Sequence, residues 1–393
     1  MATSIPLARP DITQKEIDAV VEVLQTEILS IGPKVDEFER ACAKIAHRRH
    51  AIGVSSGTAG LHCCMIAAGI KEGDEVITTP FSFVASANCI LFVGAKPVFV
   101  DIDPKTLNLD LAKVEAAITP KTKAIIAVDV FGHPGGMLEM EQLAQRHELI
   151  LIEDSCEGFG GRVVLEGRDR RTGNPVERAI GSFGRAGVFA FYPNKQITTG
   201  EGGMIVTDDD AFANTCRALR NQGREGMSWL AHQRLGYNYR LNEMSAALGI
   251  AQISRLDEIL ENRRRVAHAY IQRLMDCRYL ILPTLGTDTV MSWFVFVVRL
   301  SDLFTAADRD ELIKTLRSQG IGCANYFPPI HLQPYMVEKL GHKPGSFPVT
   351  EHVSARTIAL PFFTKMTERQ VLHVCQVLEE ALEQVLMKQQ GRF

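Results

Sequence analysis

The chain has 393 residues, of which 46% are hydrophobic and 23% are charged, so it is long enough to form two globular domains with a sizeable core. The formal net charge is −3, no dense stripe of Lys and Arg is visible, and the basic run at 168–171 is short and is interrupted by Asp169. This scattered distribution argues against nucleic acid as the main partner, because nucleic-acid binding needs a dense basic surface.

Membrane insertion and secretion are not indicated either. No apolar run approaches the roughly twenty residues that a membrane helix needs, and residues 1–10 lack the apolar centre of a signal peptide. We therefore expect a cytosolic protein that does not enter a membrane. Its nine cysteines are expected to be reduced, and because none shows the paired spacing of metal ligands, no metal site is predicted.

The elements in chain order begin with two helices. Thr13 and Glu16 form a capping-box pattern before apolar residues at helical spacing, and a second helix is predicted after the turn at 30–33. Strands and helices then alternate, with strands predicted at 75–78, 97–100, 123–128 and 149–152 and helices beginning near 84, 111 and 139. This alternation indicates an α/β fold with a mainly parallel sheet and helices on both faces.

The second half of the chain completes the sheet and adds a smaller domain. Strands at 187–191 and 203–207 follow a charged insertion between Gly160 and Gly181, for which a solvated hairpin or loop is favoured over a substrate-facing lid. A long helix beginning near Asn242 is predicted to link the domains. A strand at 293–300 and helices near 312–316 and after 367 then indicate a small α/β domain. We predict a large domain at 1–250 and a small C-terminal domain at 251–393.

One lysine stands out at the end of a predicted strand. Phe191-Tyr192-Pro193-Asn194-Lys195 precedes a Gly-rich polar turn, a pattern typical of a strand end that delivers one side chain into a pocket. Burial disfavours the ammonium and lowers the pKa of a lysine, so such an amine can attack an aldehyde and form a Schiff base. Taken alone, the same pattern also fits a solvated surface lysine.

Two further stretches raise the odds of a functional site. The apolar run at 149–153 ends in Asp154, and ligands bind at the carboxyl ends of parallel strands, although Asp154 would also suit a turn cap. Ser55-Ser56-Gly57-Thr58 opens an apolar helix, whose free N–H groups and dipole favour an anion, although an ordinary helix cap looks similar. The ordinary alternatives do not explain why an anion cradle, an aspartate and a lysine occur together in this order.

These motifs resemble those of the DegT/StrS-type family of nucleotide-sugar aminotransferases, which are fold-type I enzymes that use pyridoxal 5′-phosphate (PLP). The resemblance extends from about residue 5 to residue 363 and is carried by the motifs at 55–62, 73–77, 79–86, 153–157, 191–195 and 236–240. It implies a large PLP-binding domain, with a mainly parallel sheet of the seven-stranded type flanked by helices, and a smaller C-terminal α/β domain.

The resemblance assigns the catalytic and cofactor-binding residues. Lys195 would hold PLP covalently and, once released, would move a proton at the substrate carbon. Asp154 would pair with the pyridine nitrogen and keep it protonated. Phe83 would stack on the ring, for which plain core packing is the alternative, and the backbone of Gly57 and Thr58 would bind the phosphate.

Three further positions carry implications for the cofactor. Glu157 stands where relatives often have His or Gln near the phenolic oxygen. Ala190 departs from the family, since many relatives place a phosphate-binding serine there, and Gln196 or a water would have to compensate. Asn238 matches a residue that reaches the phosphate of the neighbouring subunit, so the resemblance implies a homodimer with shared active sites.

The substrate side is less specific. Arg240 would receive the carboxylate of the amino donor, with a surface salt bridge as the alternative. Tyr326 and His331 lie in a segment that contacts the sugar in this family, although a lone histidine is more often structural. The activity implied is transfer of an amino group from L-glutamate to a nucleotide-linked keto sugar, with a 4-keto-6-deoxyhexose as the first choice.

Several alternatives stay open. The same resemblance admits a 3-keto sugar or a keto-cyclitol as the acceptor. A PLP-dependent sugar dehydratase of the same fold carries histidine at the lysine position, and Lys195 speaks against it. A PLP-binding regulatory protein and a module that binds a nucleotide phosphate are more distant possibilities.

Overall fold

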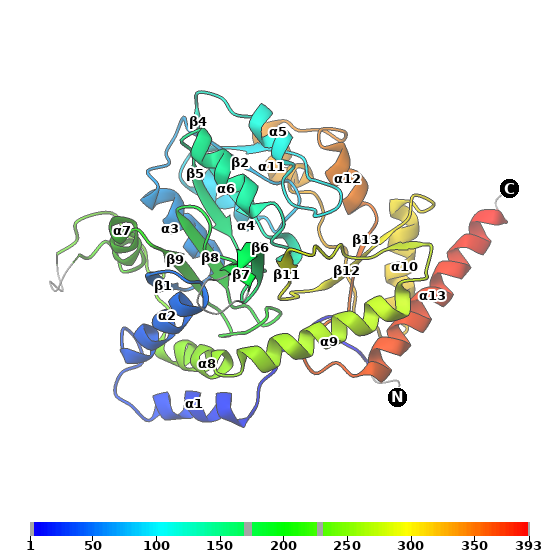
Figure 1. Cartoon of the computed structure of the whole chain (residues 1–393), viewed down its shortest axis with the longest axis horizontal. Helices are drawn as coiled ribbons and strands as arrows, with labels where there is room; N and C mark the ends of the chain where they lie inside the picture. The colour runs from blue at the N-terminus through cyan, green and yellow to red at the C-terminus, as the bar shows by residue number, and fades with distance from the viewer. Residues whose placement is uncertain (1–3, 169–174, 226–230, 392–393) are drawn as a thin grey trace.

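The computed structural model describes residues 4–168, 175–225 and 231–391. A seven-stranded sheet lies at the centre of the larger part, with the strand order β1-β9-β8-β5-β4-β2-β3 (Figure 1). Its strands are β1 (His50–Val54), β2 (Glu75–Thr78), β3 (Lys96–Phe99), β4 (Thr122–Val128), β5 (Ile150–Asp154), β8 (Ala186–Ala190) and β9 (Gly203–Thr207). Only β9 runs against its neighbours, pairing antiparallel with both β1 and β8. The predicted mainly parallel sheet is therefore confirmed.

Helices cover both faces of this sheet. One face packs on α3 (Gly57–Ala67), α4 (Ala85–Phe92) and α7 (Asp210–Arg220). The other packs on α2 (Pro33–Ile45) and α8 (Glu243–Ile253) at one end and on α5 (Leu111–Ala116) and α6 (Met137–Arg146) at the other. Neighbouring strand residues alternate between the two cores, as Leu151 and Ile152 do in β5. Burial on both faces explains why these strands are continuous apolar runs.

The smaller part contains an antiparallel sheet in the order β10-β12-β13, flanked by helices. Its strands are β10 (Leu280–Ile281), β12 (Phe296–Leu300) and β13 (Thr357–Leu360), and its longer helices are α10 (Ala306–Ser318) and α13 (Glu368–Gln390). The short helices α11 (Pro334–Leu340) and α12 (Pro348–Ser354) and the 3-10 turn η2 (Ile330–Leu332) contact the large part. The 3-10 turn η1 (Val130–Gly132) follows β4 in the large part. No helix among the described residues is long and apolar enough to cross a membrane.

The predicted single linking helix is wrong, because two helices occupy its place. Helix α8 ends at Ile253 and α9 (Leu256–Leu274) begins after a break at 254–255. Arg255 lies at this break, with φ −117° and ψ 13°, and its guanidinium pairs with Asp11 at 2.9 Å and with Glu16 at 3.0 Å. Glu16 belongs to helix α1 (Gln14–Leu24), which packs on α8.

Helix α9 is the element that links the two cores. Its first turn contributes Leu256 and Ile259 to the large-domain core, whereas Val266, Tyr270 and Leu274 belong to the core of the smaller part. The two parts therefore share a rigid element, and the division at residues 250/251 stays a proposal.

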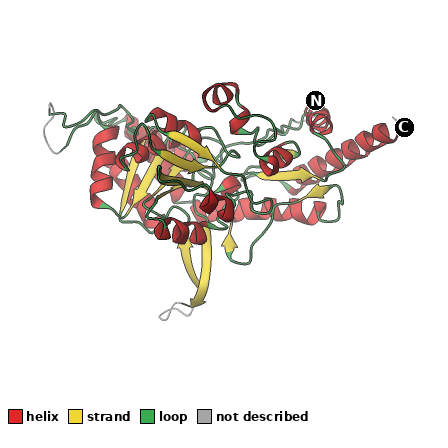
Figure 2. Cartoon of the chain, turned by 90° about the horizontal axis from the view of Figure 1, so that it is seen from above, coloured by secondary structure: helices red, strands yellow, loops and turns green. Residues whose placement is uncertain are grey.

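The charged insertion forms a hairpin, as expected. Strands β6 (Arg162–Arg168) and β7 (Pro175–Ala179) pair antiparallel and project from the body (Figure 2). A third short strand, β11 (Thr289–Val290), pairs with the base of β6, so the hairpin is attached to the segment that leads into the smaller sheet. Residues 169–174 at its tip lie outside the described residues.

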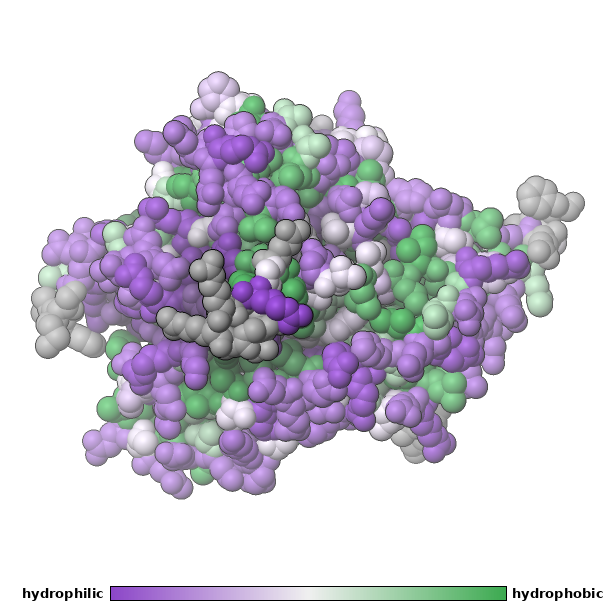
Figure 3. Space-filling model, in the orientation of Figure 1, coloured by the Kyte–Doolittle hydropathy of each residue, from purple (hydrophilic) through white to green (hydrophobic). Residues whose placement is uncertain are grey.

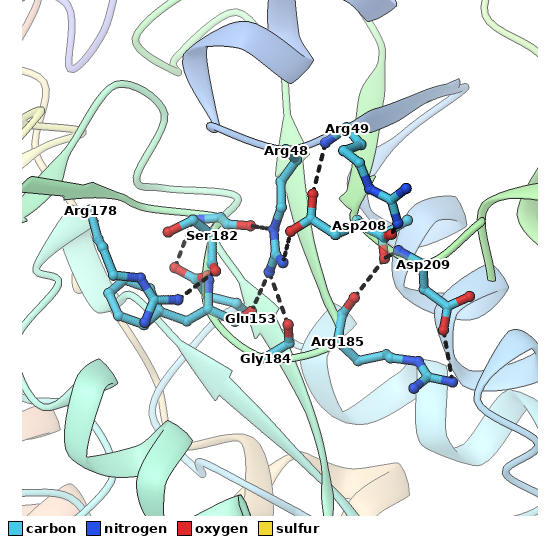
Figure 4. Close-up of polar contacts among 12 residues, drawn as sticks. Arg48, Arg49, Glu153, Arg178, Ser182, Gly184, Arg185, Asp208 and Asp209 are labelled. Carbon is cyan, nitrogen blue, oxygen red and sulfur yellow. Dashed lines mark hydrogen bonds and ion pairs between the residues drawn. The ribbon is translucent and has the colours of Figure 1, made fainter. Parts of the chain in front are cut away.

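A polar network fixes the carboxyl end of β5. The Glu153 carboxylate accepts the N–H groups of Gly181 at 2.7 Å and Phe183 at 2.9 Å. Arg48 closes the same turn by donating to the carbonyls of Phe183 and Gly184 (Figure 4). Because the N–H groups of this turn are used inside the protein, the turn before β8 is held firmly against β5.

Asp129 is fully buried beside this network, and its backbone N–H donates to the carbonyl of Asp154 at 3.2 Å. Burial, together with the charge of Glu153, raises the pKa of Asp129 well above its usual value. Burial raises the pKa of Glu153 as well, but the N–H groups of Gly181 and Phe183 oppose this rise, so we assign the proton of this buried pair to Asp129.

We expect Asp129→Asn to leave the free energy of unfolding within about 1 kcal/mol of the wild type, because the amide keeps a donor towards Glu153. Glu153→Gln should cost on the order of 2–3 kcal/mol, because an amide nitrogen cannot accept the N–H groups of Gly181 and Phe183. Urea denaturation at neutral pH measures both changes. Equal losses in the two variants would contradict the assignment of the proton.

The pH dependence of the free energy of unfolding supplies a second test of the proton assigned to Asp129. A raised folded pKa means that the folded state binds the Asp129 proton more tightly, so the associated stability is present at low pH and is lost as pH rises. Asp129→Asn has no such proton to lose. The stability of the variant relative to the wild type should therefore increase as the pH is raised above about 4.

Candidate active site

The carboxyl ends of β5 and β8 meet the first turn of α3. Ser56 caps this helix, and its Oγ accepts the N–H of Ala59 at 3.1 Å. A Cβ at Gly57 would lie 2.7 Å from Cys156 Sγ and 2.9 Å from the Cβ of Ala190. Only glycine fits this approach, which brings the backbone of the helix start to both strand ends. The first N–H groups of a helix lack partners within the helix, so this turn offers donors to an anion.

Asp154 is buried at the end of β5 and is oriented by neutral donors. Ser86 of α4 donates its hydroxyl to Asp154 Oδ2 at 2.7 Å, and the Cys156 N–H donates to Oδ1 at 3.3 Å. Among the described residues, no cationic side chain pairs with this carboxylate. A buried acid that is hydrogen-bonded but lacks a cation is well suited to hold a cationic group of a ligand.

Lys195 lies in the turn after β8, with its side chain only 12% exposed, which excludes the solvated surface alternative. Its Nζ lies 3.7 Å from Glu157 Oε1 and 3.9 Å from the ring centroid of Phe294. Burial raises the pKa of the Cys156 thiol, and Asp154 raises it further while Lys195 lowers it, so both charged groups act on this one sulfur. The structure therefore brings Gly57, Asp154 and Lys195 together.

Glu157 joins three segments at this point. Its Oε2 accepts the N–H of Phe131 at 2.8 Å, and its backbone carbonyl accepts the Gln196 amide at 2.6 Å. Burial raises the pKa of Glu157, opposed by Lys195 and by the Phe131 N–H. The carboxyl group thus titrates nearer to neutrality than an ordinary glutamate.

The suggestion that Gln196 replaces the missing serine at Ala190 is not supported. The Gln196 amide nitrogen donates both to the carbonyl of Glu157 and to Ser292 Oγ, the latter at 2.7 Å. Both of its N–H donors are thus used within the protein. Through its hydrogen bond to Ser292, Gln196 instead links the turn that contains Lys195 to the segment before β12.

Phe83 is 61% exposed, whereas Phe81, two residues before it, is fully buried. Core packing, the alternative considered for Phe83, therefore does not describe this ring. An exposed aromatic ring in the loop before α4 is available to a ligand or to a second subunit. Its stacking role stays a prediction.

The predicted partner-subunit residue and Arg240 lie in one segment. Asn238 forms an isolated bridge with Asn221, and the Arg240 guanidinium donates to the Asn221 side chain at 3.2 Å. Among the described residues Arg240 has no carboxylate partner, so the salt-bridge alternative is not observed. Arg240 lines a cavity of about 1010 Å³ together with other arginines, including Arg217 and Arg220.

The structure separates the two substrate candidates of the C-terminal segment. Burial raises the pKa of Tyr326, Glu157 raises it further, and a hydrogen bond with Asn194 opposes the change, so Tyr326 lies beside the Lys195 turn. His331 is fully buried, pairs with Glu351 at 3.0 Å and packs on Phe347. These contacts favour the structural alternative for His331, and its contact with substrate stays a prediction.

Sequence reasoning missed three side chains that shape the site: Ser86, Ser292 and Phe294. Ser86 lies in the motif at 79–86, four residues after Ser82, and the hydrogen bond between the two hydroxyl groups shows that this spacing was a usable signal. Nothing local marks Ser292 or Phe294, which reach Gln196 and Lys195 from the other part of the molecule.

Comparisons with known proteins agree with this geometry. The chain matches the model of the DegT/DnrJ/EryC1/StrS aminotransferase family over residues 10–379. It is 35% identical over 377 residues to GDP-perosamine synthase of Escherichia coli O157:H7, covering 96% of this chain and 98% of that protein. DesV of S. venezuelae has a similar structure, with a TM-score of 0.85 and 32% identity over 93% of this chain and 94% of that chain.

A further solved structure bears on the cofactor. Spr1654 from Streptococcus pneumoniae, in its PLP form, is similar with a TM-score of 0.88 and 25% identity, covering 98% of this chain and 100% of that chain. The glycine cradle at Gly57, the buried Asp154 carboxylate and the buried Lys195 amine together fit a phosphate, a pyridinium and an aldehyde on one ligand. The chain therefore belongs to the DegT/DnrJ/EryC1/StrS aminotransferase family and is a PLP-dependent sugar aminotransferase.

Proposed function

We propose that the protein transfers an amino group from L-glutamate to the keto group of a nucleotide-linked deoxysugar, with a 4-keto-6-deoxyhexose as the first choice. The observation that carries this proposal is the buried Lys195 amine, held 3.7 Å from Glu157 and over the ring of Phe294. A family member named GDP-perosamine synthase, a name that denotes a nucleotide-linked amino sugar, supports this acceptor class.

Each residue of the site has a different proposed role. PLP, when bound, supplies an aldehyde and an electron-withdrawing ring. Asp154 would hold the proton on the ring nitrogen, and the first turn of α3 at Gly57 and Thr58 would bind the phosphate. The Lys195 amine would take a proton from one substrate carbon and return it at another position, while Glu157 offers a nearby acid whose raised pKa suits proton exchange.

The substrate would enter from the arginine-lined side. The cavity lined by Arg240 is large enough for a nucleotide-sized ligand, and its guanidinium groups favour phosphates and carboxylates, although Asp36 and Glu225 line it as well. Arg240 would receive the carboxylate of the amino donor, and Tyr326 would contact the sugar. A homodimer in which Asn238 reaches the neighbouring site completes the proposal, with a cytosolic location as the accompanying expectation.

Replacing Lys195 should abolish turnover. Lys195→Ala should lower kcat by about 10³-fold or more, because it removes the only buried amine assigned to proton transfer. In the wild type, borohydride should abolish the visible absorption band and leave the mass of the cofactor on Lys195. Lys71→Ala, which alters an exposed lysine, is the matched control. Normal turnover in Lys195→Ala would contradict the role proposed for it.

A subunit-mixing experiment tests the shared site. Lys195→Ala and Asn238→Asp subunits should each be inactive, but a mixed dimer contains one site with an intact lysine from one subunit and an intact asparagine from the other. Random mixing at equal amounts should therefore restore about a quarter of the wild-type activity. Activity no greater than the sum of the two parents would place Asn238 in the site of its own subunit.

A substrate panel tests the acceptor. With glutamate as donor, we expect nucleotide-linked 4-keto-6-deoxyhexoses to release 2-oxoglutarate at least ten times faster than the matching 3-keto sugars. Lys195→Ala provides the blank. A preference for the 3-keto sugars would overturn the first choice, and uniform inactivity with active donor half-reaction would point to a keto-cyclitol.

A further inference from the structure

A cavity of about 180 Å³ lies between the two parts of the molecule, and its lining does not include Lys195. Its walls come from the loops at 104–107 and 130–133 of the large part and from residues 281–299 and Thr357 of the small part. A dry protein cavity of about 150 Å³ is known to hold benzene, so this one has room for a small organic molecule. Figure 3 shows apolar side chains gathered on this face, over β12.

Most of the wall is apolar and buried. Phe131, Trp293, Val295 and Val297 line the cavity and are each less than a tenth exposed. Such a wall favours an aromatic ring or a branched aliphatic group, because filling it removes apolar surface from water.

His133 supplies an unpartnered donor. The side chain lines the cavity and is 7% exposed, and its Nδ1 accepts the N–H of Gly135 at 3.0 Å. The neutral imidazole therefore carries its proton on Nε2. Nε2 is buried, and it meets no acceptor among the described residues at full hydrogen-bond geometry, although the carbonyl of Thr284 forms a weaker contact with the ring, and Asp103 and Asp288 act on its charge from farther away. A buried donor without an acceptor costs free energy that a ligand oxygen would recover.

Arg299 adds positive charge to the same cavity. Its guanidinium donates one hydrogen bond, to the carbonyl of Pro104 at 3.0 Å. Among the described residues no carboxylate forms an ion pair with it, and Asp302, which pairs with Arg356, acts on its charge only from farther away. Lys105 lines the same cavity from the loop at 104–107. Two cations and an imidazole donor beside an apolar wall match a carboxylate attached to a hydrophobic body.

We propose that this cavity is a second ligand site, separate from the active site, which binds a small monocarboxylate with an aromatic or branched aliphatic body of about six to nine non-hydrogen atoms. The carboxylate would meet Arg299 and the Nε2–H of His133, and the apolar body would lie against Trp293 and Val297.

One segment separates this cavity from the active site. Met291 and Trp293 line the cavity, whereas Ser292 bonds to Gln196 and Phe294 lies over the Lys195 amine. Phe131 is shared in the same way, since it lines the cavity while its N–H donates to Glu157. An occupant of the cavity therefore contacts the reverse side of the wall that supports the catalytic groups.

Tryptophan fluorescence gives a local readout. The chain has two tryptophans, of which Trp229 lies outside the described residues, so Trp229→Phe leaves Trp293 as the only reporter. In this background, on the PLP-loaded protein, benzoate and 3-methylbutanoate should change the emission saturably. Benzyl alcohol, which lacks the charge, should bind at least ten times more weakly.

Substitutions then locate the carboxylate. Arg299→Met should weaken benzoate binding by about ten-fold or more while leaving benzyl alcohol unaffected. Arg278→Met, at an exposed arginine outside the cavity, is the matched control and should change neither. Val297→Phe, which fills the cavity, should abolish binding of both probes, and a thermal melt verifies that this variant is folded.

Three results would overturn the proposal. The first is an emission that does not saturate with benzoate, and the second is equal affinity for benzoate and benzyl alcohol. The third is benzoate binding that survives Arg299→Met but is lost in Arg240→Met, which would assign the carboxylate to the active site instead.

Discussion

A buried ion pair between Glu157 and Lys195 is the interaction on which the site depends. One carboxylate oxygen faces the amine, the other accepts the Phe131 N–H, and the backbone carbonyl of the same residue accepts the Gln196 amide. Removing one member of such a pair leaves an unpaired charge away from water, which is strongly destabilising. Because Glu157 follows β5 and Lys195 follows β8, the pair also fixes the spacing of two strand ends.

The large-domain fold could be predicted because its signals are local. Apolar runs of strand length alternated with amphipathic stretches, and parallel strands joined by helices place their carboxyl ends at one edge, which is where Asp154 and Lys195 were expected. The reversed direction of β9 and the break between α8 and α9 had no such signal. At this break Arg255 pairs with Asp11 and Glu16, which are more than two hundred residues away in the chain, so no local pattern could reveal the contact.

In the candidate site, too, local signals could be predicted and contacts between distant residues could not. The sequence identified the types of residue required but not their partners. Gln196 looked free to bind a phosphate, yet its amide is used by Glu157 and Ser292. His331 looked like a substrate contact, yet it pairs with Glu351 inside the protein. The neutral state of Asp129 was also hidden, because it results from burial beside Glu153 and not from any pattern of neighbours.

Arg263 connects helix α9 to the segment that contains Phe294. This buried guanidinium, on the helix that enters both cores, donates to the carbonyls of Trp293 and Phe294, each at 2.7 Å. Burial among neutral acceptors lowers the pKa of Arg263 to about 9. The Phe294 ring above the Lys195 amine is thus held by α9 and by the smaller sheet, whereas the amine itself follows a strand of the large sheet. Neither half of the polypeptide holds a finished reaction centre, so chemical competence appears only when the complete chain has assembled.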